Sequence, residues 1–129
     1  MKLWVDDVRP APEGYVWCKS VNMTKFKIEH LEQYRQSVMT KMDLAAQDGR
    51  YEDEVAWNNH LQSEIANITI IDIDHDAGDY ARDGGDYIKL LDWLEETGRN
   101  YSIHIHSQNP VGVENMRRII ERNGWREIR

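Results

Sequence analysis

The chain has 129 residues, a formal net charge of −7 and a single cysteine, Cys18. We predict one domain over residues 1–129, because a chain of this length buries roughly two thirds of its unfolded surface. The negative charge argues against nonspecific binding along DNA or RNA, and one cysteine excludes an internal disulfide bond. The first residues, M-K-L-W-V-D-D, lack a signal-peptide core, and no apolar run reaches the length of a membrane span, so we expect a cytoplasmic protein.

Two strands are predicted near the N-terminus, over residues 1–5 and 15–21, because aromatic and β-branched side chains are frequent in both. Asp6 and Asp7 follow the first strand at once, and Pro10 prevents its continuation. These aspartates either make turn hydrogen bonds, as Asp often does after a strand, or belong to a site.

A helical hairpin is predicted over residues 22–67. Asn22 or Thr24 is suited to cap the first helix. Apolar side chains then recur at steps of three and four, at Leu31, Tyr34, Val38, Met42 and Ala45. A second helix over residues 51–66 has apolar side chains on two sides, which either pack within the chain or leave one side for a partner chain.

The run I-T-I-I-D-I-D-H-D-A-G, residues 68–78, predicts a buried strand that ends in charged residues, because β-branched residues dominate it and a glycine closes it. The period of two places three acids, Asp72, Asp74 and Asp76, on one face. Acids this close repel one another and resist burial unless a cation or a solvated crevice compensates. This strand therefore indicates a site.

Further elements follow in strand and helix order. A helix is predicted over residues 86–97, with Gly98 as its stop, and a strand over residues 101–107. A helix from Pro110 to about residue 122 has Asn109 as its cap, and the final W-R-E-I-R suggests a short edge strand. This order favours an α/β fold with a mostly parallel sheet and right-handed crossovers.

Chemically active residues lie at the carboxyl ends of three predicted strands, where open α/β sheets bind ligands. These groups are Asp6-Asp7, Asp74-His75-Asp76 and His104-x-His106-Ser107. Clustered carboxylates favour Mg²⁺ or Mn²⁺, and two imidazoles move the preference toward Mn²⁺, Fe²⁺ or Zn²⁺. We therefore expect a divalent metal, Mg²⁺ or Mn²⁺, with Zn²⁺ as the alternative.

The same crevice is suited to a phosphate group. The helix that starts near Pro110 directs free N–H groups and the positive end of its dipole toward it. An imidazole beside a phosphate acts as a general acid or base near neutral pH. Arg9 and Arg82 either clamp the negative charge or have exposed structural roles.

Three separated blocks, L-W-V-D-D-V-R-P, I-D-I-D-H-D-A-G-D and I-H-I-H-S-Q-N-P-V-G-V-E-N-M, closely resemble the cyclic-phosphate processing receiver domains. The resemblance implies a receiver or flavodoxin-like three-layer sandwich, with an inserted helical hairpin in this chain, and an activity on cyclic phosphates. By the same resemblance, Asp6 and Asp7 match the acidic pair that holds Mg²⁺ in receivers. Asp74 matches the phospho-accepting aspartate, and Ser107 matches the hydroxyl residue after the fourth strand.

The chain also departs from ordinary receivers. His75, Asp76, His104 and His106 are additional, and no fifth strand followed by a lysine is evident, which speaks for hydrolysis or ligand capture rather than a phosphorelay. The hairpin is long for a connector, so it covers the crevice, sets the substrate size or forms a dimer contact.

Three hypotheses follow: a metal-dependent phosphoesterase acting on a cyclic nucleotide or an RNA 2′,3′-cyclic phosphate end, a non-catalytic module that captures such a ligand, and a receiver-like interaction domain. The phosphoesterase hypothesis assigns metal binding to Asp6, Asp7 and Asp74, catalysis to His104, His106, His75 and Ser107, and substrate binding to Asp76, Asn109 and Arg9. Asp72 lies deeper in its strand, so we expect a buried group hydrogen-bonded to a neighbour. The expected partner is a small phosphorylated ligand or an RNA end, not extended double-stranded DNA or a membrane, with a homodimer through the hairpin as a further expectation.

Overall fold

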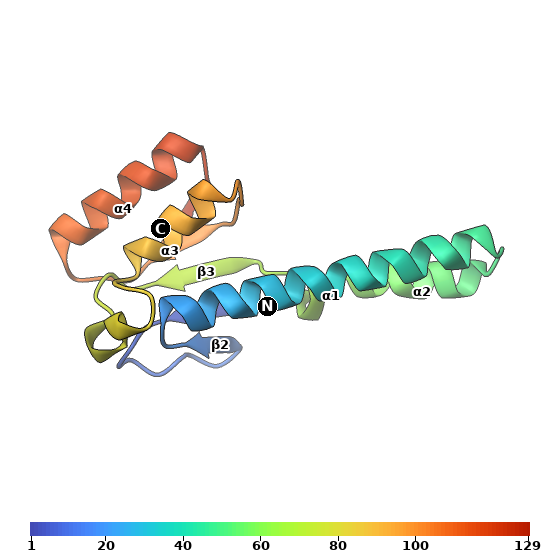
Figure 1. The fold of residues 1–129 in the computed structure, drawn as a ribbon, viewed down its shortest axis with the longest axis horizontal. Helices are drawn as coiled ribbons and strands as arrows, with labels where there is room; N and C mark the ends of the chain where they lie inside the picture. Colours follow the sequence, from blue (N-terminus) through green and yellow to red (C-terminus); the bar gives the residue numbers. More distant parts are fainter.

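The computed structural model describes residues 1–129, and its five parallel strands form one sheet in the order β2-β1-β3-β4-β5 (Figure 1). The strands are β1 (Lys2–Val5), β2 (Tyr15–Cys18), β3 (Ile70–Ile73), β4 (Ile103–Ile105) and β5 (Glu127–Ile128). Every neighbouring pair is parallel. The predicted receiver-like α/β fold is confirmed, and the short C-terminal edge strand is present.

The helices agree with the predicted order but differ at some ends. They are α1 (Val21–Gln47), α2 (Tyr51–Leu61), α3 (Ile88–Glu96) and α4 (Pro110–Asn123), with the 3-10 helices η1 (Glu64–Ala66) and η2 (Gly78–Arg82). Asn109 caps α4 as predicted, since its Oδ1 accepts a hydrogen bond from the Gly112 N–H. The predicted cap of α1 is wrong: Ser20 is the N-cap, and its hydroxyl accepts from the Met23 N–H.

Two predicted elements are shorter in the structure. The second strand ends at Cys18 rather than at residue 21, because Ser20 already caps α1 and donates a hydrogen bond to Asp83. The helix predicted over residues 51–66 ends at Leu61, where the Asn67 side-chain amide donates to the Leu61 carbonyl. That side chain satisfies a carbonyl that the last turn of the helix leaves free.

The three helices α1, α3 and α4 lie on one face of the sheet, in front of it in Figure 1. Leu3, Ile71 and Ile103, which point to that face, join side chains of all three helices in one buried core. β1 continues into β2 through a loop without a helix. The helices thus form a single layer, and the second helical layer of a three-layer sandwich is not seen in this chain. Half-buried side chains such as Trp4 and Trp17 line the opposite face.

The hairpin formed by α1 and α2 extends away from the sheet at the amino ends of its strands. In Figure 1, β3 points to the left and the hairpin extends to the right. The amino group of Met1 donates to the carbonyls of Glu64 and Asn67, which places the hairpin base beside the start of β1. The expectation that the hairpin covers the crevice or sets the substrate size is therefore wrong, because ligand crevices lie at the opposite, carboxyl edge.

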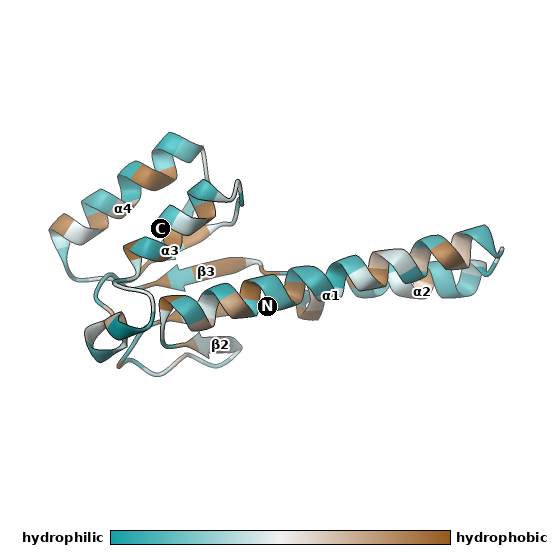
Figure 2. Cartoon of the chain, viewed as in Figure 1, coloured by the Kyte–Doolittle hydropathy of each residue, from teal (hydrophilic) through white to brown (hydrophobic).

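Hydropathy differs between the sheet and the hairpin. Figure 2 shows that β3 is hydrophobic over most of its length and hydrophilic at its carboxyl end, whereas hydrophobic and hydrophilic residues are interspersed along the hairpin. None of the helices combines the length and apolar character that crossing a membrane requires.

Candidate functional site

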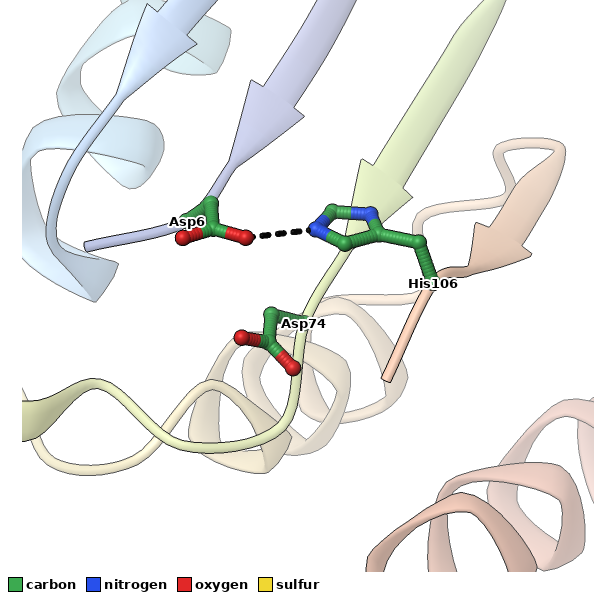
Figure 3. Close-up of side chains that lie close together, drawn as sticks. All are labelled: Asp6, Asp74 and His106. Atoms are coloured by element: carbon green, nitrogen blue, oxygen red, sulfur yellow. Dashed lines mark hydrogen bonds and ion pairs between the residues drawn. The ribbon is translucent and has the colours of Figure 1, made fainter. Parts of the chain in front are cut away.

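Three strand ends bring Asp6, Asp74 and His106 together (Figure 3). Val5, Ile73 and Ile105 are aligned in the sheet register, so the residue after each lies at the same level of the carboxyl edge. One side-chain atom of each of the three lies within 4.8 Å of the others. Two carboxylates and an imidazole from distant parts of the sequence thus form the polar centre of the candidate site.

Asp6 serves both the turn after β1 and this centre. Its Oδ1 accepts from the backbone N–H groups of Val8 and Arg9, at 2.9 and 2.8 Å. These are the turn hydrogen bonds that formed the alternative explanation of the acidic pair. Its Oδ2 lies 2.9 Å from His106 Nε2, and the residue is fully buried. Both carboxylate oxygens of Asp6 therefore have partners within the protein.

His106 is held on both ring nitrogens and on one ring face. Nδ1 lies 2.6 Å from Asp72 Oδ1, while Nε2 faces Asp6. The ring stacks on Trp4, with centroids 3.8 Å apart and planes 1° from parallel. Burial lowers the pKa of His106, but the hydrogen bonds to Asp72 and Asp6 and their negative charges raise it more, so the net pKa lies above the ordinary 6.5. The protonated ring is therefore favoured as a donor to both carboxylates.

His104 shares the Asp72 oxygen but has a free second nitrogen. Its Nδ1 lies 2.7 Å from Asp72 Oδ1, and its side chain is 33 % exposed, against 7 % for Asp72. No protein group contacts its Nε2 within hydrogen-bonding distance. The expectation that Asp72 is a buried, hydrogen-bonded residue is confirmed, although its two histidine partners were not foreseen.

Asp7 lies outside the group of three, but the negative charges of Asp6 and Asp74 act on it. A Cβ added at Gly78, which has φ of +53°, would lie 2.3 Å from Asp7 Oδ2, so the carboxylate packs directly on this glycine. Burial raises the pKa of Asp7 above 3.8, and the negative charges of Asp6, Asp74 and Asp76 raise it further. His106 therefore takes the place in the cluster that the sequence assigned to Asp7.

The remaining predicted residues gather at the start of α4. His75 Nδ1 lies 2.9 Å from Asp76 Oδ1 and 3.4 Å from the Asn109 side-chain nitrogen. The His75 ring packs on Gly112 of α4, where a Cβ would approach it to 2.4 Å. The Ser107 hydroxyl accepts from the Asn109 N–H, so these two side chains shape the turn into the helix.

The two arginines for which a phosphate clamp and an exposed structural role were both open differ in position. Arg9 donates from Nη1 to the His106 carbonyl at 3.0 Å, which places its guanidinium at the edge of the site. Arg82 is exposed on η2. Arg9 is therefore the arginine that the structure places next to the cluster.

The site is an open edge rather than an enclosed cavity. The four cavities of the structure are lined by other residues. One of about 400 Å³ lies between β2 and the start of α1, with Trp17, Met23 and Phe26 among its walls. A ligand at the cluster would thus be reached directly from solvent.

Two residues of the site were missed from the sequence. Asp72 was left out of the functional set, although the register pairs it with His104 on the neighbouring strand. Trp4 was not singled out, although the alternation of β1 places it on the same face as Asp6. The alternation of side chains along each strand was visible in the sequence in both cases. Only the strand order shows that these side chains are neighbours.

A parallel sheet in this strand order, with acids after β1 and β3 and a hydroxyl residue after β4, defines a receiver-like domain. The sequence model of the family described as "Cyclic-phosphate processing Receiver domain" matches residues 1–122, and the chain belongs to this family. Searches of curated proteins and of solved structures found no match.

Proposed function

We propose that this receiver-like domain is a metal-dependent phosphoesterase that opens a cyclic phosphate, in a nucleotide or at the 2′,3′ end of an RNA. The observation that carries the proposal is the meeting of Asp6, Asp74 and His106 at one strand edge, with His104 beside them. The family description, which names cyclic-phosphate processing, supports the substrate class.

The residues of the cluster fit a divalent metal ion. Two carboxylates and an imidazole are suitable ligands for Mn²⁺ or Zn²⁺, and Mg²⁺ would draw mainly on the carboxylates. The crowded negative charge around Asp7 is of the kind that a cation compensates. A metal held by Asp6, Asp74 and His106 would polarise a phosphoryl oxygen, and Asp7 remains a proposed additional ligand.

The residues of this chain have separate roles in the proposed reaction. Hydrolysis adds water across one P–O ester bond: the water loses a proton and the departing ribose oxygen gains one. The free Nε2 of His104 is suited to move that proton. Arg9, His75 and Asn109, with Asp76 and Ser107 behind them, border the edge where the phosphate would lie.

The test is a hydrolysis assay with the purified chain. It uses 2′,3′- and 3′,5′-cyclic nucleotides and cyclic oligonucleotides with Mg²⁺, Mn²⁺ or Zn²⁺. We expect turnover that Asp74→Ala abolishes and that Asp43→Asn, an exposed change on the hairpin, leaves intact. Failure to cleave any of these compounds with any of these metals would refute the proposal. Activity that survives Asp74→Ala would indicate a metal-free mechanism instead.

A second candidate is a module that captures the cyclic phosphate without cleaving it. Both oxygens of Asp6 already accept hydrogen bonds within the protein, which makes this carboxylate less available to a metal and favours this candidate. Stoichiometric binding of a cyclic nucleotide, with unchanged ligand recovered after denaturation, would select it over the phosphoesterase.

A third candidate is a receiver-like interaction domain that assembles through the hairpin. Leu44, Tyr51 and Val55 near the tip of the hairpin are at least half exposed. A homodimer through these helices is a proposal that light scattering after size-exclusion chromatography tests. A stable dimer without metal or phosphate binding would favour this candidate.

A further inference from the structure

The Asp72 carboxylate is the one buried acid of the sheet that touches two histidines at once. The register places Asp72 between Trp4 on β1 and His104 on β4. Its Oδ1 lies 2.7 Å from His104 Nδ1 and 2.6 Å from His106 Nδ1. Both rings thus face the same oxygen with the same nitrogen.

A carboxylate oxygen at Nδ1 fixes the proton position of an imidazole whose Nε2 has no partner, as in His104. A neutral ring carries one N–H, and an ionised acceptor at Nδ1 draws that proton to Nδ1. The lone pair is then left on Nε2, which is the form that accepts a proton or binds a metal. A carboxylate as buried as Asp72 in turn needs such donors, because burying an unpaired charge is costly.

From this geometry we infer that Asp72 is a positioning residue: it holds His104 in the Nδ1–H tautomer with Nε2 free, and it keeps the His106 ring oriented with Nε2 toward Asp6. The inference rests on the proposed function for its catalytic consequence. The side-chain hydrogen bonds of Asp72 go to these two histidines, and Asp72 is not one of the three residues of the cluster.

The two histidines then have different tasks. His106 Nε2 faces the Asp6 carboxylate, and the stacked Trp4 ring limits its rotation. His104 Nε2 has no protein partner and its side chain is one-third exposed. His106 is therefore the metal-side imidazole, and His104 is the one that exchanges a proton with substrate.

The direct test is the ring tautomer, measured by long-range ¹⁵N–¹H NMR at alkaline pH. In the wild-type chain we expect His104 as the Nδ1–H form, because its Nδ1 faces Asp72 and its Nε2 has no protein partner. In Asp72→Asn we expect His104 to shift toward the Nε2–H form that predominates in free imidazole side chains. Glu127→Gln is the control: this carboxylate is 11 % exposed and pairs with Arg117 on the helix-covered face, so its loss should leave the His104 tautomer unchanged.

The kinetic test uses the same variants. Loss of a residue that orients a metal-bound or catalytic histidine typically costs about 10- to 100-fold in activity or metal affinity. We expect Asp72→Asn to lower kcat by this factor with little change in KM, and Glu127→Gln to change neither.

The inference fails if wild-type His104 is the Nε2–H tautomer, a result that needs no variant to fold. It also fails if a folded Asp72→Asn retains the wild-type tautomer of His104. A wild-type chain that shows the expected His104 tautomer but cleaves nothing would refute the phosphoesterase proposal and leave Asp72 as the positioning residue of a binding site.

Discussion

At the scale of single residues, close packing around the site leaves little room for change. Asp6 is the clearest case, since one oxygen holds the turn after β1 and the other holds His106. A substitution there would alter the backbone and the site together. More informative variants change a neighbour that contacts only one functional side chain.

Gly112→Ala is such a change. Alanine gains up to about 1 kcal/mol in helix propensity over glycine, but its Cβ would lie 2.4 Å from the His75 ring, and overpacking of this kind costs about 1–3 kcal/mol. We expect a net loss of stability in urea unfolding and a displaced His75 ring resonance in NMR. Glu121→Ala, exposed on the same helix, should change stability by less than about 0.5 kcal/mol. A Gly112→Ala variant as stable as wild type, with an unmoved His75 signal, would contradict this packing.

Glu32 predicts a pH dependence of stability. Arg99 contacts both of its oxygens and the Tyr101 hydroxyl donates to Oε1 at 2.7 Å. The hydrogen bond from Arg99 is the main cause that lowers the pKa of Glu32 below 4.5. Because the folded pKa is the lower one, the stabilisation is present above pH 4.5 and is lost as the pH falls through the folded pKa.

The measurement compares wild type with Glu32→Gln in urea at neutral and at acid pH. The carboxylate is 36 % exposed, so we expect a difference below about 1 kcal/mol at pH 7. That difference should shrink as the pH falls through the folded pKa of Glu32, below which the carboxyl group is protonated in both states. A difference that stays constant with pH would show that the ion pair does not contribute through the charge of Glu32.

At the scale of elements, the hairpin is anchored by polar groups rather than by a large apolar surface. Outside the main core, the buried hydrophobic residues of its two helices are Leu31, Val38, Ala45 and Leu61. Arg35 joins its base, with Nη1 donating to the carbonyls of Leu61 and Ala66 at 2.9 Å and to Asn67 Oδ1 at 2.6 Å. One guanidinium thus ties α1 to the end of α2 and to the segment that enters β3.

Arg35→Met should therefore loosen this junction. It leaves the Ala66 carbonyl and Asn67 Oδ1 without this donor, while the Leu61 carbonyl keeps the Asn67 amide, and an unsatisfied, partly buried group costs about 1–3 kcal/mol. We expect the free energy of unfolding in urea to fall by this amount. Amide hydrogen exchange should become faster than in wild type, and the increase should be larger in α2 than in β3. Lys25→Met, a cation on the sheet-packed part of α1, is the control and should leave exchange in α2 unchanged. Equal exchange in α2 of the Arg35 variant and wild type would argue against the anchor.

At the scale of the whole molecule, the strand order gathers negative charge at one edge while the hairpin extends from the other. Asp6, Asp7, Asp74 and Asp76 lie at the carboxyl edge, within a chain that already carries a net charge of −7. The helices cover one face of the sheet only. The stability of the fold is therefore expected to respond to cations at that edge.

Metal binding should appear as a stability change. A ligand at 100 times its Kd stabilises the folded state by about 2.7 kcal/mol, so saturating Mn²⁺ should raise Tm by several degrees and EDTA should reverse the effect. Asp74→Asn should lose this response, while its metal-free Tm should equal or exceed that of wild type because one crowded charge is removed. Asp79→Asn, exposed on η2, should respond like wild type. An Mn²⁺ response that survives in Asp74→Asn would place the metal elsewhere.

Sequence alone determined the class of the fold and the chemical character of its site. β-branched runs, turn residues and helical spacing predicted the order of strands and helices, and alternation placed acids and imidazoles together on the faces of residues 68–78 and 101–107. The same blocks carried the family resemblance that the match over residues 1–122 confirmed. These features depend on residues that are close in the sequence, so they can be recognised without knowledge of the packing.

Only the tertiary structure decided which of these groups meet. Strand order and register bring His106 rather than Asp7 into contact with Asp6, and they place two histidines on one oxygen of Asp72. The faces of the crossovers put α1, α3 and α4 in one layer, and the hairpin extends away from the site. These outcomes depend on contacts between residues as many as 100 positions apart, as between Asp6 and His106, which no local pattern encodes.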